Sequence, residues 1–189
     1  MKRDPVNVQH RPFMTPIWLV GIAGFLVLAV AIFGIWIWGT ANATTVIVIR
    51  HAEKEAGNLV DPQLSAAGEA RAALLERMFG DAKGPGRLDA IYSSPALRNR
   101  LTAAPLAAQL GIAPIVAPAD DAKGLVRRVL REHSGGRVLI IGHVNTVPAI
   151  VSELSARNDI PGIDERDYAV MYVVTVPRIG RANLLRMSY

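Results

Sequence analysis

An unbroken apolar segment near the N-terminus constrains this chain more than any other feature. The 22 residues from Ile17 to Trp38 include no charged and no strongly polar side chain. As a helix rising about 1.5 Å per residue they would be roughly 33 Å long, enough to cross the hydrocarbon core of a bilayer. Trp18 and Trp36 lie near its two ends, where aromatic side chains anchor membrane helices. A core helix this long would show a polar face, so we expect residues 17–38 to be a transmembrane helix.

The charges on either side of this segment predict its orientation. No charge follows it until Arg50, and three basic residues precede it: Lys2, Arg3 and Arg11. The positive-inside rule therefore predicts a single-pass protein of the inner (cell) membrane, with residues 1–16 as a cytoplasmic tail. Residues 39–43 would form a short tether, and residues 44–189 a domain in the periplasm or another extracytoplasmic space.

The sequence Ala41-Asn42-Ala43 leaves one alternative open. An A-x-A sequence is the pattern of a signal-peptidase site, so cleavage after Ala43 would remove the apolar segment. The apolar run is longer than the h-region of about 7–15 residues found in cleaved signals, which favours a retained signal anchor.

Composition excludes several function classes. The chain has no cysteine, which rules out a disulfide framework, a thiolate zinc site and a cysteine nucleophile. The formal net charge of +5 would suit nucleic-acid binding, but part of it belongs to the N-terminal segment, where three basic residues face only Asp4. Interleaved aromatic residues and a nucleic-acid reader motif are missing as well. We therefore expect no nucleic-acid partner.

After Thr44, β-branched apolar runs alternate with helical segments. The expected strands cover residues 45–49, 88–92, 113–116, 137–141, 168–176 and 182–187. The expected helices cover residues 64–79, 95–110, 122–132 and 146–154, the second with Ser94 as N-cap and Pro95 at its first position. This alternation predicts an α/β fold: a three-layer α/β/α sandwich with a mainly parallel sheet, formed by residues 44–189.

Histidines and arginines fall where the expected strands end. Arg50 and His51 directly follow the first strand, His143 follows the strand over 137–141, and Arg98 lies early in the helix after the second strand. Parallel sheets bind ligands at this carboxyl edge. Guanidinium groups match phosphate oxygens, and a neutral imidazole is a competent nucleophile. We therefore expect a phosphate site here, whereas His133, near the end of a helix, is expected to be structural or exposed to solvent.

Three motifs resemble those of the histidine phosphatase superfamily, the phosphoglycerate mutase-like fold. They are Arg50-His51-Ala52, then Ser93-Ser94-Pro95-Ala96-Leu97-Arg98 with Thr102-Ala103, and Gly142-His143-Val144-Asn145-Thr146. With the apolar segment, the chain resembles a small bacterial membrane-anchored member. The resemblance implies that His51 is the residue phosphorylated in the reaction and that Arg50, Arg98 and His143 bind the phosphate. We expect no metal or other cofactor, because the two arginines supply the positive charge and no cluster of carboxylate or histidine ligands with metal spacing accompanies them.

The resemblance also implies an acidic residue after the third strand, which protonates the leaving oxygen. Asp121 is the candidate, and Glu53, two residues from the expected nucleophile, is its rival. Asp120 and Asp121 would equally suit capping of the helix that begins at Ala122.

The expected activity is that of a phosphoric monoester hydrolase working through a phosphohistidine intermediate on His51. Its substrate would be a phosphorylated small molecule, an envelope glycan or lipid, or a phosphoprotein. The alternative is a catalytically silent module on the same fold that binds phosphate or a phosphopeptide. A binder has no need of the nucleophile, so the presence of both histidines and both arginines favours the enzyme.

Overall fold

The computed structural model describes residues 17–57 and 60–189, in two compact units, one ending at Trp38 and the other covering Gly39–Tyr189. Helix α1 (Ile17–Ala41) carries the apolar run, and its stretch Trp18–Gly39 is long and apolar enough to cross a membrane. Residues 18–38 are exposed throughout, unlike the core helix of a soluble domain. The basic residues used to predict orientation lie outside the described residues.

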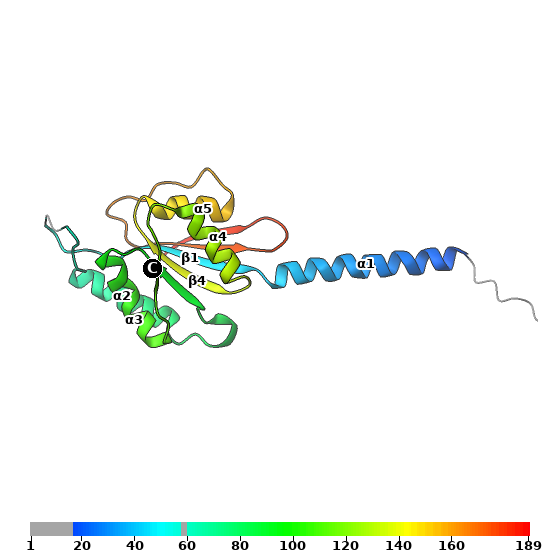
Figure 1. Ribbon diagram of the computed structural model, residues 1–189, viewed down its shortest axis with the longest axis horizontal. Helices are drawn as coiled ribbons and strands as arrows, with labels where there is room; N and C mark the ends of the chain where they lie inside the picture. The colour runs from blue at the N-terminus through cyan, green and yellow to red at the C-terminus, as the bar shows by residue number, and fades with distance from the viewer. Residues whose placement is uncertain (1–16, 58–59) are drawn as a thin grey trace, which may run out of the picture. The chain divides into compact units, whose positions relative to one another are not determined.

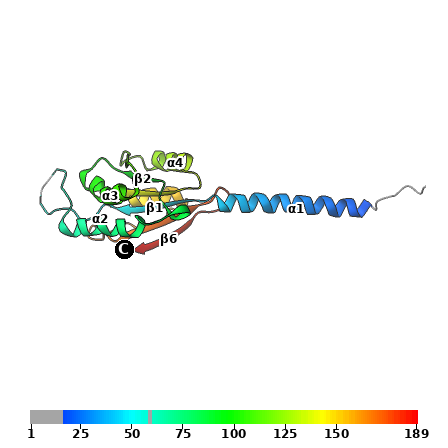
Figure 2. The same cartoon turned by 90° about the horizontal axis from the view of Figure 1, so that it is seen from below.

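The second unit is built on a six-stranded sheet with the order β3-β2-β4-β1-β5-β6. The strands are β1 (Thr44–Arg50), β2 (Ala90–Ser93), β3 (Ile115–Val116), β4 (Arg137–Gly142), β5 (Val170–Val176) and β6 (Asn183–Ser188). The first four are mutually parallel, β5 pairs antiparallel with β1, and β6 at the sheet edge pairs antiparallel with β5 (Figure 2). The expected mainly parallel sheet is confirmed.

Helices cover both faces of this sheet (Figure 1). They are α2 (Ala66–Phe79), α3 (Leu97–Leu110), α4 (Ala122–Glu132) and α5 (Thr146–Ser155), with a short 3-10 turn at Gly84–Gly86. One apolar cluster joins the sheet to α4 and α5, and another joins it to α2 and α3. The predicted three-layer α/β/α sandwich is therefore confirmed.

The middle of the central strand β1, residues 46–49, is apolar at every position because both faces of the strand are buried. Val46 and Val48 belong to the cluster with α4 and α5, whereas Ile47 and Ile49 belong to the cluster with α2 and α3. Successive side chains of a strand point to opposite faces, and both faces of β1 are covered.

Strand pairing brings the ends of three strands to one edge. Arg50 at the end of β1 pairs with Gly142 at the end of β4, and Ser93 at the end of β2 pairs with Ile141. The residues that follow these strands, His51 among them, are therefore neighbours in space.

Helix α3 begins two residues later than the sequence predicts, at Leu97 rather than Pro95. Ser94 does not cap the helix; its Oγ lies 2.9 Å from Nε2 of His143. The cap comes instead from the carboxylate of Asp61, which accepts the Leu97 N–H at 3.0 Å from a loop far away in sequence. The serine is thereby available to the site at the sheet edge.

Candidate active site

The carboxyl edge of the sheet holds an open cleft of about 500 Å³. Its lining includes all four side chains expected to handle phosphate: Arg50, His51, Arg98 and His143. Two carboxylates, those of Asp120 and Glu165, line it as well, together with Lys54, Asn145 and Tyr168. In the described part of the chain, no group of three or more histidine or carboxylate side chains could hold a metal ion.

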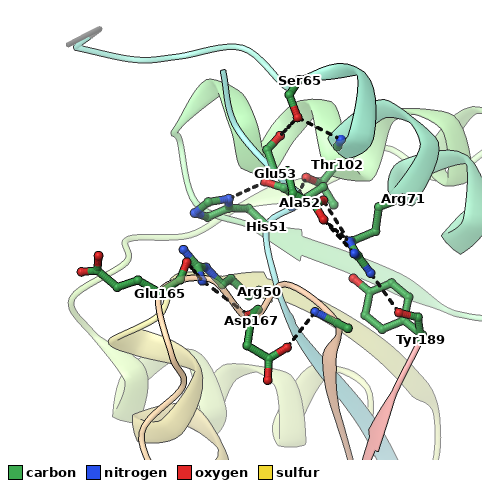
Figure 3. A network of polar contacts seen from close by, with 12 residues as sticks. Arg50, His51, Ala52, Glu53, Ser65, Arg71, Thr102, Glu165, Asp167 and Tyr189 are labelled. Carbon is green, nitrogen blue, oxygen red and sulfur yellow. Dashed lines mark hydrogen bonds and ion pairs between the residues drawn. The ribbon is translucent and has the colours of Figure 1, made fainter. Parts of the chain in front are cut away.

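His51 is held in one tautomer. Its Nδ1 lies 2.8 Å from the carbonyl oxygen of Ala52 (Figure 3). A carbonyl can only accept, so Nδ1 carries the proton and Nε2 keeps its lone pair. The main chain of Ala52 is fixed in turn, because its N–H donates to Oγ1 of Thr102 at 3.0 Å. The ring is therefore prepared to act as a nucleophile through Nε2.

The environment of His51 keeps the imidazole neutral. Burial of the ring, assisted by the charges of Arg98 and Arg50, lowers its pKa from 6.5 to about 4, although the hydrogen bond to Ala52 acts in the opposite direction. Burial is the largest cause of the lowered pKa, because the residue is only 5 % exposed. At pH 7 the lone pair is consequently free to attack.

Arg50 is buried beside His51 and is held by main-chain oxygens. Its Nη1 donates to the carbonyls of Asp164, Glu165 and Asp167 at 3.1, 2.7 and 3.4 Å. The guanidinium carbon lies 3.9 Å from the centre of the Tyr168 ring. Among the residues that the structure describes, no carboxylate forms an ion pair with Arg50. Its positive charge is therefore available to an anion.

Arg98 and His143 form the opposite side of the site. Nη2 of Arg98 lies 3.3 Å from Nδ1 of His143, and because a guanidinium only donates, Nδ1 is the acceptor. The proton of the neutral ring is then on Nε2, which donates to Oγ of Ser94. Burial, followed by the charges of Arg98 and Arg50, lowers the pKa of His143. The His51 and His143 ring centres are 5.4 Å apart, so both histidines face one small space.

Asn99 fixes the helix that carries Arg98, and the sequence analysis does not single it out. Its side-chain amide is fully buried and donates to the carbonyl of Ile141 at 2.8 Å, which ties α3 to the end of β4. The only hint of this role in the sequence is that Asn99 directly follows Arg98 of the second motif.

The arginines also carry the clearest sign that this site can bind an anion. The Nε atoms of Arg50 and Arg98 are buried and have no hydrogen-bond partner among the described residues. Buried N–H groups are nearly always satisfied in proteins, and the exceptions call for a ligand or a water. A phosphate between the two guanidiniums would satisfy both.

The two residues predicted as general acid are engaged elsewhere. Oδ1 of Asp121 accepts the N–H of Gly124 at 2.7 Å as the N-cap of α4, and Asp121 does not line the cleft. Glu53 is bound by Arg71 through contacts of 2.7 to 3.0 Å (Figure 3). Burial alone would raise the pKa of Glu53, but the hydrogen bonds and charge of Arg71 outweigh it and lower that pKa.

Asp120 and Glu165 are the carboxylates that line the cleft. Asp120 was recognised in the sequence only as a capping residue, because nothing there tells which of two adjacent aspartates faces the site. Glu165 lies in the loop between α5 and β5, where no periodicity indicates orientation. His133 lies outside the cleft lining, with Nε2 3.0 Å from the hydroxyl of Tyr92, as expected for a structural residue.

Comparison with known proteins agrees with this geometry. The sequence model of the histidine phosphatase superfamily (branch 1) matches residues 46–120. No curated protein matches the chain. Among solved structures, the protein histidine phosphatase SixA complexed with tungstate is 20 % identical, with 76 % of this chain and 96 % of that chain covered at a TM-score of 0.64.

Two further structures have the same fold and are named for different substrates. A mycobacterial glucosyl-3-phosphoglycerate phosphatase is 16 % identical, with 75 % of this chain and 97 % of that chain covered at a TM-score of 0.60. A putative alpha-ribazole-5'-P phosphatase from Escherichia coli K-12 is 15 % identical, with 78 % and 97 % covered at a TM-score of 0.58. At these identities the likeness establishes the fold.

Proposed function

We propose that this chain is a member of the histidine phosphatase superfamily, whose sequence model matches residues 46–120, and that it hydrolyses phosphomonoesters through a phosphohistidine formed on His51. The observation that carries the proposal is the state of His51: buried, neutral, and with the lone pair on Nε2. Beside it lie the buried Arg50 and the partly exposed Arg98, whose buried Nε atoms lack hydrogen-bond partners among the residues that the structure describes. A nucleophile next to groups that can bind the phosphate anion is what phosphoryl transfer requires.

In the first step, Nε2 of His51 attacks phosphorus, the N–P bond forms and the bond to the ester oxygen breaks. Arg50 and Arg98 bind the non-bridging oxygens, whose charge they stabilise in the transition state. His143 joins them when its Nε2–H turns from the Ser94 hydroxyl to a phosphate oxygen. The ring becomes cationic as it is phosphorylated, and the hydrogen bond from Nδ1 to the Ala52 carbonyl stabilises that charge. In the second step water attacks phosphorus, and His51 leaves as neutral imidazole.

The departing oxygen needs a proton, which a carboxylic acid in the cleft can donate. We place this role on Asp120 or Glu165, which line the cleft, instead of Asp121, whose side chain caps α4. The same group, once ionised, can take a proton from the attacking water in the second step.

We propose that α1 anchors the enzyme in the cell membrane as a single-pass signal anchor, with the catalytic domain on the extracytoplasmic side. Its support is the apolar stretch Trp18–Gly39 together with the basic residues that precede it in the sequence. Substrates would then be phosphorylated small molecules, envelope glycans or lipids, or phosphoproteins outside the cytoplasm.

Hydrolysis of p-nitrophenyl phosphate by the full chain in detergent tests the activity. The key variant is His51→Ala, and His133→Ala is its matched control, because it removes a histidine of the same domain outside the cleft. We expect His51→Ala to lower turnover by on the order of 10³-fold or more, and His133→Ala to keep it. A wild-type chain that binds phosphate without any turnover would instead be the silent binding module.

A further inference from the structure

We propose that the loop Asp164–Tyr168 (below, the 164–168 loop) is the positioning element that orients Arg50 for phosphate binding, with Tyr168 as its positioning side chain. The inference rests on the proposed function, because it concerns the phosphate site. Neither the 164–168 loop nor the Tyr168 side chain belongs to the three sequence motifs. The loop lies between α5 and β5, more than 100 positions after Arg50.

The contacts of Arg50 determine which edge of the guanidinium is free. Nη1 has two hydrogens, and three carbonyl oxygens of the loop region lie within 3.4 Å of it. Nη1 is therefore fully used by the main chain. Nε is buried and has no partner among the described residues. The edge formed by Nε and Nη2 is left for a phosphate, which it can bind through two parallel hydrogen bonds.

The chemical nature of the acceptors matters as much as their number. Figure 3 shows two arginines held in different ways: Arg71 by the carboxylate of Glu53, and Arg50 by main-chain oxygens. A carboxylate would neutralise the guanidinium and compete with a phosphate. Carbonyl oxygens satisfy its N–H groups without cancelling its charge. The side chain of Glu165 extends away from Arg50, so that only its carbonyl takes part (Figure 3).

The ring of Tyr168 packs against the planar face of the Arg50 guanidinium. The Arg50 guanidinium lies 3.9 Å from the centre of the ring, within the range of a cation–π contact. The Tyr168 and His51 ring centres are 5.9 Å apart. One aromatic side chain thus contacts both the cation and the nucleophile, and it limits the rotation of the guanidinium about its long side chain.

The loop is itself fixed by short-range hydrogen bonds. Oδ1 of Asp164 accepts the N–H of Arg166 at 2.7 Å, and the Asp164 carbonyl accepts the N–H of Asp167 at 3.0 Å. Oδ1 of Asp167 accepts the N–H of Ala169 at 3.1 Å. These turns satisfy the N–H groups within the loop and turn its carbonyls toward Arg50.

A double-mutant cycle tests the proposal on the full chain in detergent: wild type, Tyr168→Leu, Arg50→Lys and the double variant, with Tyr168→Phe as the conservative control. The dissociation constant of inorganic phosphate is measured by calorimetry. KM and kcat are measured by the hydrolysis of p-nitrophenyl phosphate. We expect Tyr168→Leu to weaken phosphate binding and raise KM by about tenfold, with a smaller effect on kcat, and Tyr168→Phe to stay within about twofold.

The coupling between the two residues decides the outcome. Lysine has no planar fork to be oriented, so in the Arg50→Lys background Tyr168→Leu should change phosphate binding by less than about twofold. The same tenfold loss in that background, or a Tyr168→Phe variant that binds phosphate as weakly as Tyr168→Leu, would overturn the proposal.

If circular dichroism shows that Tyr168→Leu does not fold, Asp164→Ala replaces it. We expect this variant to bind phosphate more weakly, and unchanged binding would refute the role of the loop. Because calorimetry needs no turnover, an inactive wild type would refute the proposed function and leave this test intact.

Discussion

Burial of a neutral His51 makes a quantitative prediction about folding stability. The folded state holds the pKa of His51 at about 4, whereas an unfolded chain leaves it near 6.5. Between these values the unfolded state binds the proton and the folded state does not, so acid favours unfolding. The stability linked to His51 is complete above pH 6.5 and is lost as the pH falls toward 4.

The size of this loss follows from the difference in pKa. One pKa unit corresponds to about 1.4 kcal/mol, so the full effect is about 3.4 kcal/mol, of which about 2.4 kcal/mol is lost between pH 7 and pH 4.5. His51→Asn removes the titrating group, while its side-chain amide can still donate to the Ala52 carbonyl. The variant should therefore lack this component of the pH dependence.

Urea unfolding of the full chain in detergent micelles, followed by circular dichroism at several pH values, measures the effect. The difference in unfolding free energy between wild type and His51→Asn should change by about 2.4 kcal/mol from pH 7 to pH 4.5, with the wild type losing more. All other titrating groups are common to both chains. A difference that stays flat over this range would show that His51 is solvated and would refute the burial that prepares it for attack.

Three further results are expected. Activity should survive EDTA, because Arg50 and Arg98 supply the positive charge at the site; loss on chelation with recovery on adding one divalent ion would contradict this. Asp120→Asn or Glu165→Gln should slow hydrolysis of an alkyl phosphate by roughly 10²–10⁴-fold and largely spare p-nitrophenyl phosphate, whose leaving group needs no proton, while Asp121→Asn serves as the control. The chain should resist carbonate extraction from membranes and a C-terminal reporter should be active only outside the cytoplasm, whereas a mature product beginning at Thr44 would indicate cleavage after Ala43.

Local sequence patterns predicted the elements well where the chain's own signals decide them. The helix over 122–132 has the predicted bounds, and Gly111 ends α3 with φ 66°, in the left-handed conformation that glycine adopts without strain. The observed helix bounds differ from the predicted ones where residues distant in sequence supply the hydrogen bonds. Ser94 and Pro95 are a good start for a helix, yet the serine bonds to His143, and Asp61 supplies the cap for α3.

Some residues of the site could be placed from the sequence and others could not. Arg50, His51, Arg98 and His143 follow strands that end at one edge, so their convergence could be argued from topology. The choice among carboxylates could not, because it depends on which way side chains of loops point. Glu53 lies close to the nucleophile in sequence, but it is bound by Arg71 from α2. The hydrogen bonds that the 164–168 loop gives Arg50 come from main-chain carbonyls, which every residue type has, so the sequence does not reveal them.

The most direct test of the account is to trap the phosphoenzyme. The full chain is mixed with a radiolabelled phosphomonoester, quenched, digested and mapped by mass spectrometry, with His51→Ala and His133→Ala run in parallel. The account predicts an acid-labile, alkali-stable phosphate on His51, present in the His133→Ala variant and missing from the His51→Ala variant. Label on another residue, or turnover by His51→Ala, would contradict it.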